Sequence, residues 1–275
     1  MLRKLLSVVG VSSLLIIPPL TASSAANLPV KAPPPRPARA VSWTGFYVGA
    51  NVGWAGERVN NTYLAPGPGF PGFLAADQSA ISAGSSNNIS QSTAIFGVQA
   101  GYNHQVNKTG LIAVEIDINR LGFSNTINVT FATPLAGPVN SVTSQSFGWL
   151  LTARPRLGII FADRWLAYAT GGLAVVNAGF SETNTYSPLF VNAGVDYINL
   201  SRIQVGGTGG GGLEYAIADH WSIKGEYLHV WLPTLNGFST TPSPFFPPPA
   251  GTAVYGHNVT AGIDVVRIGV NYRLN

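Results

Sequence analysis

The feature that most constrains this chain is a strict alternation of apolar and polar residues over short segments. From Ile112 to Asn119, branched apolar side chains occupy the even positions, whereas Ala, Glu, Asp and Asn occupy the odd ones. A period of two places alternate side chains on opposite faces of a β-strand. The same period recurs at 95–103, 212–217 and 266–274. The pattern predicts an all-β protein whose strands have one apolar and one polar face.

Eight segments fit this pattern, and the connections between them alternate in length. The expected strands cover residues 43–55, 94–106, 110–123, 146–161, 164–178, 204–217, 220–232 and 258–274. Tight turns fall at 107–109, 162–163 and 218–219, and long polar connections at 56–93, 124–145, 179–203 and 233–257. Such connections are typical of outer-membrane barrels and unusual in a soluble sandwich. We therefore predict an eight-stranded antiparallel up-and-down transmembrane barrel with short periplasmic turns and long extracellular loops.

The composition agrees with a lipid-facing surface. Hydrophobic residues make up 46% of the 275 positions and charged residues only 9%, whereas soluble domains carry about 25% charged residues. The absence of cysteine excludes disulfide frameworks, thiolate zinc sites and cysteine nucleophiles. Fifteen basic and eleven acidic residues, without a basic cluster among aromatic residues, exclude nucleic acid as a partner.

The first residues predict export. Arg3 and Lys4 precede an apolar run at 5–20 and then small residues up to Ala26, which is the pattern of a secretory signal peptide. We expect residues 1–26 to be a signal peptide for Sec export to the Gram-negative outer membrane. The two prolines within the short apolar run argue against an N-terminal membrane anchor. Residues 27–42 are rich in proline and predict a semi-rigid periplasmic tether, so the barrel domain covers 43–275.

The six tryptophans fall at the ends of the expected strands. Three of them lie beside the tether or the tight turns and three beside the long connections: Trp43, Trp165 and Trp221, and Trp54, Trp149 and Trp231. At about 3.3 Å per residue and a tilt near 45°, the interval from Trp43 to Trp54 covers roughly 25 Å, the height of an apolar band. Tryptophan favours membrane interfaces. We expect these residues to form a membrane-interface belt in contact with outer-membrane lipid.

The polar strand faces carry four acidic and four basic residues. They are Glu115, Asp117, Glu214, Glu226, Arg154, Arg156, Lys224 and Arg267. Eight strands enclose an interior just wide enough for side chains, and buried charges must be paired. We predict a lumen filled by ion pairs, with hydrogen bonds added by Asn51, Gln99, Asn119 and Asn271. A selectivity ring for small solutes is the alternative function of these charges.

The sequence contains few patterns that indicate catalysis. Residues 207–212 satisfy the nucleotide-binding pattern G-x-G-x-x-G, but a strand follows where a helix would be required. His229 and His257 flank the last long connection, so a speculative hemin site there is weighed against ordinary interface polarity. No Ser, His and Asp set has a spacing that supports catalysis. We therefore expect a non-enzymatic protein without a metal or a resident cofactor.

Several stretches resemble small porin-family, opacity-protein-like outer-membrane proteins of alphaproteobacteria. They are WTGFYVGANVGWAG (43–56), RWLAYATGGLA (164–174), GGGLEYAIADHWSIKGEYLHV (210–230), VRIGVNYRLN (266–275) and the tether AANLPVKAPPP (25–35). The resemblance implies an eight-stranded barrel in the outer membrane, and relatives that include hemin binders and immunogenic surface proteins. It also implies that the assembly machinery recognises the C-terminal strand by a terminal aromatic residue. This chain ends on Asn275, so Tyr272 would take that part.

Three roles fit the predicted architecture. The first is support of envelope integrity by a barrel whose lumen is filled. The second is binding or adhesion of a host or surface ligand through the loops, where Phe70, Phe73, Phe245 and Phe246 are candidate contacts. The third is weak diffusion of small solutes through the lumen.

Overall fold

The computed structural model describes residues 41–65, 75–134, 137–186, 194–242 and 252–274. The expected signal peptide, nearly all of the tether and the four loop phenylalanines lie outside these residues. The described chain contains nine strands and one helix. None of its helices is long and apolar enough to cross a membrane.

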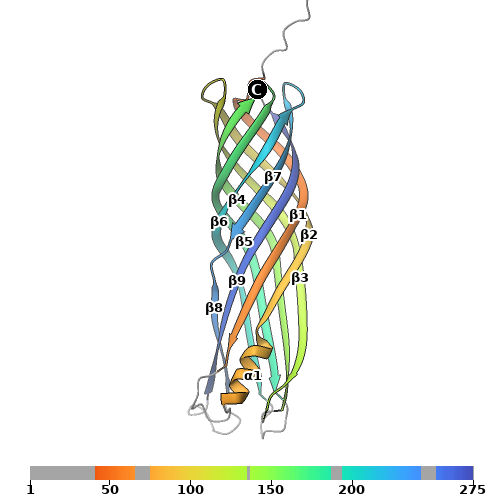
Figure 1. The fold of residues 1–275 in the computed structure, drawn as a ribbon, viewed down its shortest axis with the longest axis vertical. Helices are drawn as coiled ribbons and strands as arrows, with labels where there is room; N and C mark the ends of the chain where they lie inside the picture. The colour runs from red at the N-terminus through yellow and green to blue at the C-terminus, as the bar shows by residue number, and fades with distance from the viewer. Residues whose placement is uncertain (1–40, 66–74, 135–136, 187–193, 243–251, 275) are drawn as a thin grey trace, which may run out of the picture. The chain divides into compact units, whose positions relative to one another are not determined.

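The strands form one antiparallel sheet that closes on itself. In chain order the elements are β1 (Gly45–Leu64), α1 (Ala75–Ser85), β2 (Asn87–Gln105), β3 (Gly110–Ala132), β4 (Pro138–Phe161), β5 (Trp165–Tyr186), β6 (Val195–Ala216), β7 (Trp221–Trp231), β8 (Leu235–Pro242) and β9 (Thr252–Arg273). Each strand from β1 to β7 pairs with the next, β7 pairs with β9, and β9 pairs with β1 (Figure 1). Because β7 and β8 pair with successive parts of β9, they count as one strand of the ring. The prediction of an eight-stranded barrel is confirmed.

In the membrane half of the strands, the apolar residues of the alternating pattern face outward and the polar residues face the lumen. On β9, Val266 and Ile268 are 60% and 66% exposed, whereas Arg267 between them is 1% exposed. On β3, Ile112 to Ile118 likewise point outward at every second position, and Glu115 and Asp117 point inward. The tight turns also lie where they were expected, since β2, β4 and β6 end at Gln105, Phe161 and Ala216.

The predicted long loops are wrong in extent, because most of their residues belong to strands. β3 and β4 extend to Ala132 and from Pro138, so that 124–145 is largely a hairpin, and 179–203 and 233–257 also contain long strand segments. The reason is that the apolar and polar residues exchange faces along these strands. Beyond Leu121 on β3, Phe123 is buried inside while Ser124 and Thr126 face outward. A strand with a polar outer face does not carry the lipid-facing pattern on which the prediction depended.

Helix α1 is a further element that the sequence did not indicate. It lies within the connection predicted as loop 56–93, beside the ends of the strands far from the C-terminus (Figure 1). Its Ile81 is fully buried in an apolar cluster with Tyr63, Val139 and Tyr186. One buried isoleucine among Ser, Ala, Gly, Asp and Gln gives almost no amphipathic pattern, which explains why the helix was missed.

The strands are longer than a membrane requires. β1 has 20 residues and β4 has 24. At about 3.3 Å per residue and a tilt near 45°, 20 residues rise by roughly 47 Å, against about 25 Å for the apolar band. On β1 the outward residues from Phe46 to Trp54 are mostly apolar, and Arg58, Asn60 and Thr62 follow. We define Trp54, Trp149 and Trp231 as the upper aromatic rim, beyond which the outer wall is polar.

Beyond the upper aromatic rim, the ring divides into two sheets. The pairing of β2 with β3 ends at Phe96–Arg120, and that of β6 with β7 ends at Gly207–Trp231. β8 pairs with β9 alone. Register shifts between Arg120 and Phe123 and between Phe147 and Leu150 mark the same transition. The described strands thus form two four-stranded groups, β8-β9-β1-β2 and β3-β4-β5-β6, which we call the outer sandwich.

Candidate functional site

The interior of the barrel is the candidate site, and it has three layers. Above a small apolar cluster around Trp43 beside the tight turns, a network of charges comes first, an apolar layer follows, and a second polar cluster lies between the two sheets of the outer sandwich. Each layer is built from the inward positions of the strands, because alternate side chains point into the lumen.

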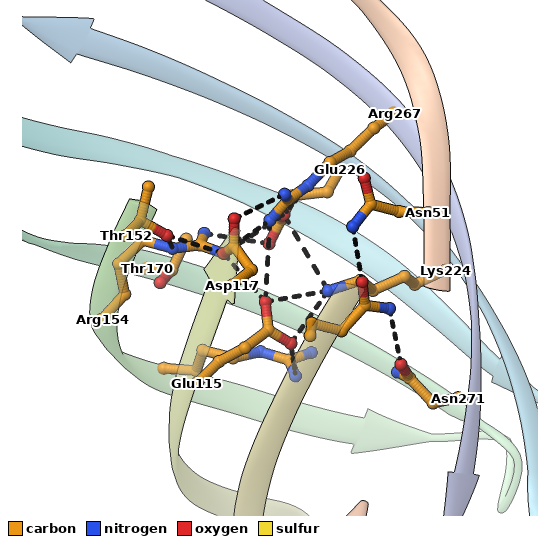
Figure 2. A network of polar contacts seen from close by, with 12 residues as sticks. Asn51, Glu115, Asp117, Thr152, Arg154, Thr170, Lys224, Glu226, Arg267 and Asn271 are labelled. Carbon is orange, nitrogen blue, oxygen red and sulfur yellow. Dashed lines mark hydrogen bonds and ion pairs between the residues drawn. The ribbon is translucent and has the colours of Figure 1, made fainter. Parts of the chain in front are cut away.

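Arg154 of β4 is the centre of the charged network. Its Nη2 atom lies 2.8 Å from Glu115 Oε1 and 2.7 Å from Asp117 Oδ2. Its Nη1 atom lies 3.1 Å from Glu226 Oε1 on the opposite wall. Figure 2 shows how these side chains converge from different strands. One guanidinium thus contacts three carboxylates.

The other cations complete the network. Arg156 Nη2 lies 2.9 Å from Glu214 Oε2, and Lys224 Nζ lies 2.8 Å from Glu115 Oε1. Arg267 Nη1 lies 2.8 Å from Asp117 Oδ1, and its Nη2 atom contacts Glu226. The structure therefore brings all eight predicted charges into one buried network, in which every charge has an opposite partner.

The four predicted amides lie in the same layer. Asn119 donates to Asp117, Gln99 donates to Asn271, and Asn271 donates to Glu214, at 2.7, 2.8 and 2.9 Å. Asn51 donates to Gln99. Asn271 thus occupies the Glu214 oxygen that Arg156 leaves free, and Asn119 adds a second donor to an Asp117 oxygen that Arg267 contacts. Such bonds lower the cost of burying the carboxylates.

Two tyrosines of this layer were missed by sequence reasoning. Tyr47 donates to Glu115 at 2.7 Å, and Tyr168 donates to Glu226 at 3.1 Å. The Arg156 guanidinium also lies 3.7 Å from the centroid of the Tyr168 ring. Tyr47 has the same parity on β1 as Asn51, so its inward position could have been found from the alternation.

An apolar layer fills the lumen above the charges. Its buried members come from all nine described strands, and the largest include Phe123, Phe147, Leu121, Leu150, Phe180 and Ile263. The rings of Phe123 and Phe147 meet edge to face, with centroids 6.2 Å apart. A packed apolar layer excludes water from this part of the lumen.

Glu57 is a buried carboxyl group beside this layer, three residues beyond Trp54. It is 1% exposed, lies between Ala55 and Val59 on β1, and accepts a hydrogen bond of 2.7 Å from Gln145. Its Oε2 atom has no hydrogen-bond partner among the described residues. Burial raises the pKa of Glu57 from its usual 4.5 to about 7. The sequence reasoning missed this group because it assigned residue 57 to a loop.

Replacing Glu57 with glutamine is expected to stabilise the barrel at alkaline pH. An acid whose pKa is raised by folding stabilises the folded state fully below pH 4.5, and this contribution is lost as the pH rises to about 7. At pH 8 the variant should therefore exceed the wild type by about 2–3 kcal/mol in free energy of unfolding. Urea titrations in lipid vesicles between pH 4 and pH 8 measure the difference. Equal pH slopes for the two proteins would contradict the expectation.

The third layer holds polar side chains between the two sheets of the outer sandwich. Tyr63 donates to Asp196 at 2.7 Å, and Asn61 donates to Glu182 at 2.8 Å. His257 lies 2.8 Å from Ser239 Oγ and 3.5 Å from Glu182 Oε2. Sequence reasoning placed Glu182 and Asp196 in a loop, so it did not find this cluster.

The speculative hemin site at His229 and His257 is not formed. His257 is fully buried inside the barrel, whereas His229 lies on the outer face, 2.7 Å from Asp264. Asp264 is seven residues from His257 on β9, so the wall and about 20 Å of strand separate the two rings. Within the part of the chain that the structure describes, no group of three His, Cys, Asp or Glu residues could hold a metal ion.

Five of the six predicted belt tryptophans lie on the outer face. Trp54, Trp231, Trp221 and Trp165 are exposed, and Trp149 is half-buried. Trp43 does not belong to the belt, because it is fully buried. It precedes β1 and packs inside against Val41, Leu111 and Leu166, with Arg273 5.1 Å from its ring centroid. Trp43 continues the inward parity of Tyr47, whereas Trp54 has the outward parity, so the alternation itself separates the two tryptophans.

The fold agrees with comparisons to known proteins. Residues 19–273 match the outer membrane protein beta-barrel domain family. The chain belongs to this family. A 31 kDa outer-membrane immunogenic protein of Brucella melitensis biotype 1 is 30% identical over 213 residues, which cover 76% of this chain and 81% of that protein. The protein of the same name from Brucella suis biovar 1 gives the same values.

Solved structures show similar barrels at low sequence identity. The outer membrane protease OMPT from Escherichia coli has a TM-score of 0.44 and 8% identity, covering 84% of this chain and 97% of that chain. Ail, the attachment invasion locus protein of Yersinia pestis, has a TM-score of 0.35 and 12% identity, covering 83% and 99%. Family membership places this chain in the Gram-negative outer membrane.

Proposed function

We propose that this protein is a closed, non-enzymatic outer-membrane barrel that supports envelope integrity. The observation that carries the proposal is the filling of the lumen. The charged network joins opposite walls through Arg154 and Glu226, and the apolar layer lies directly above it. Solute passage would require ion pairs to separate and buried apolar groups to be hydrated, and both are costly.

The barrel is proposed to stand with its tight turns in the periplasm. Bacterial barrels have short periplasmic turns and longer extracellular connections. The outward tryptophans then lie at the two lipid interfaces, with outer-membrane lipid around the apolar wall between them. The outer sandwich would project from the cell by roughly 20 Å, as the strand lengths require.

The C-terminal strand is proposed as the contact with the assembly machinery. Tyr272 faces outward near the end of β9, and its ring centroid lies 4.9 Å from that of Trp221. This gives the strand an exposed aromatic residue close to its end, although the last residue is not aromatic.

Catalysis is not part of the proposal. Among the residues that the structure describes, Ser239, His257 and Glu182 are grouped most like a catalytic triad, and they are 4%, 0% and 1% exposed. A substrate would have no access to the hydroxyl group. Their contacts hold the two sheets of the outer sandwich together instead.

Conductance in planar lipid bilayers tests the closed lumen. The purified barrel should show no stable openings of the size that wide porins give. A variant that opens both layers, Arg154→Gly and Arg267→Gly with Phe123→Gly and Phe147→Gly, removes large side chains from the network and from the apolar layer and should admit ions if it folds. The shift in gel mobility on boiling verifies folding. Stable openings of the wild-type barrel would overturn the proposal.

Cysteine labelling of intact cells tests the orientation. The natural chain has no cysteine, so a single introduced thiol is the only target. Asn60→Cys, on the exposed face of β1 beyond the upper aromatic rim, should react with a membrane-impermeant maleimide on whole cells. Lys108→Cys, in an exposed tight turn, should react only after the cells are permeabilised. The reverse result would invert the orientation.

Surface recognition is a second candidate function. Phe238 and Tyr197 are 76% and 56% exposed on the outer sandwich, and exposed aromatic residues are common in contact surfaces. Both Brucella relatives are named as immunogenic. Binding of the barrel to host matrix proteins, lost in Phe238→Ser with Tyr197→Ser while heat-modifiable mobility is retained, would favour this role.

A further inference from the structure

A polar hollow of about 400 Å³ lies on the outer wall just beyond the upper aromatic rim. Its lining includes Gly56, Arg58, Ser90, Ser92 and Asp264. Gly56 pairs with Ser92 on one side and with Asp264 on the other, and it contributes no side chain. A Cβ atom at Gly56 would meet only Ser92 Oγ, at 3.7 Å. The glycine therefore leaves a recess in the wall that the fold itself does not require.

The polar groups of the hollow include an available cation. Asp264 accepts a hydrogen bond of 2.7 Å from the Tyr227 hydroxyl and lies 2.7 Å from His229 Nδ1. These contacts lower the pKa of Asp264, the hydrogen bond with His229 most strongly. Arg58 is exposed and its charge acts on Asp264 from nearby, but among the described residues no hydrogen bond or ion pair within 4.0 Å holds its guanidinium. An exposed guanidinium without a direct hydrogen bond suits a phosphate, and serine hydroxyls beside an ionised carboxylate suit the hydroxyl groups of a sugar.

An apolar hollow of about 560 Å³ shares β1 and β9 with the polar hollow and lies within the lipid-facing band. Its lining includes Val52 of β1, Ile268 of β9, Leu213 of β6 and Gly225 of β7. A Cβ atom at Gly225 would meet no atom within 4 Å, so this part of the wall is open. Val52 is four residues from Gly56 on β1, about 13 Å along the strand. The two hollows together present a polar recess above an apolar one.

We propose that β1 and β9 form a binding site for a phosphorylated glycolipid of the outer leaflet. The phosphate binds Arg58, the sugar hydroxyls bind Ser90, Ser92 and Asp264, and an acyl chain follows Val52 and Ile268 towards Gly225. A soluble anion would leave the apolar hollow unused, and a phospholipid without a saccharide would have no hydroxyl groups to meet the serine and aspartate side chains. The site rests on the orientation given under the proposed function, and it does not depend on a closed lumen.

Two variants distinguish specific binding at the polar hollow from non-specific attraction between the barrel and the lipid. Arg58→Ala removes the cation, and Gly56→Leu fills the polar hollow without changing the charge. Arg120→Ala is the matched control, because Arg120 is an exposed arginine that pairs with Trp149 at the upper aromatic rim but does not line the hollow. The heat-modifiable mobility of each variant shows whether it is folded.

Binding of bisphosphorylated lipid A to the full barrel in neutral detergent micelles, measured by native mass spectrometry, tests the proposal. Both site variants should weaken binding about tenfold or more, the loss expected for one charge-assisted contact, and Arg120→Ala should not. Dephosphorylated lipid A should also bind about tenfold more weakly, and inorganic phosphate in excess should not compete. Unchanged binding in both site variants, or an equal loss in Arg120→Ala, would overturn the site. Cysteine labelling reports failure of the orientation separately.

Discussion

Replacing Arg154 with alanine is expected to lower the free energy of unfolding by about 3–5 kcal/mol, the cost of breaking a buried ion pair. Arg154 contacts Glu115, Asp117 and Glu226 within 3.1 Å, and all of these side chains are excluded from water. Removal of the guanidinium leaves three buried carboxylates to share Lys224, Arg156 and Arg267. Urea unfolding in lipid vesicles, followed by tryptophan fluorescence, measures the change.

Two further variants make the Arg154 result interpretable. Arg154→Lys retains the charge but loses the planar fork, so it should recover only part of the loss. Arg120→Ala removes an exposed arginine and should change the stability by less than about 0.5 kcal/mol. If Arg154→Ala is as mild as Arg120→Ala, the network does not hold the walls together.

Replacing Phe123 with alanine is expected to cost about 3–5 kcal/mol as well, through a cavity in the apolar layer. Phe123 is 2% exposed, packs against Phe147, and lies where β3 changes register against β4. The neighbouring side chains come from different strands of a closed wall, which limits their collapse into the space. The same urea titration in vesicles measures the effect.

The matched control for Phe123 is Phe238→Ala, which removes a ring that is 76% exposed. That change should stay within about 0.5 kcal/mol of the wild type. Phe123→Leu keeps most of the volume and should lose less than Phe123→Ala. A loss below about 1 kcal/mol for Phe123→Ala would show that the apolar layer is loosely packed.

The membrane half of the barrel could be predicted from the sequence because its strands face lipid on one side and a polar lumen on the other. These two environments require apolar and polar residues to alternate. Lipid requires Ile112, Val114 and their equivalents on one face, and the narrow lumen requires Glu115 and Asp117 on the other. The tight turns then fix the pairing. Parity alone was enough to place eight charged residues in one lumen, although it could not tell which carboxylate meets which guanidinium.

The outer half could not be predicted in the same way, because its outer face contacts water and therefore carries polar residues. Thr126 faces outward, whereas Phe123 and Phe131 lie inward, so the apolar residues change faces near Leu121. Serine, threonine and asparagine, which are typical of loops, here form the exposed side of strands. His257 and Glu182 were consequently placed outside the barrel, and their contact across the outer sandwich was missed.

The division of the wall at the upper aromatic rim sets different limits on sequence change in the two halves. In the membrane half every strand is paired on both sides, so an inserted residue would shift the register around the whole circumference. In the outer sandwich the pairing is interrupted between β2 and β3 and between β6 and β8. Hairpins there can lengthen or shorten without reaching the opposite sheet. The chain can therefore vary the surface that it presents outside the cell while its membrane-spanning ring keeps the same strand number and register.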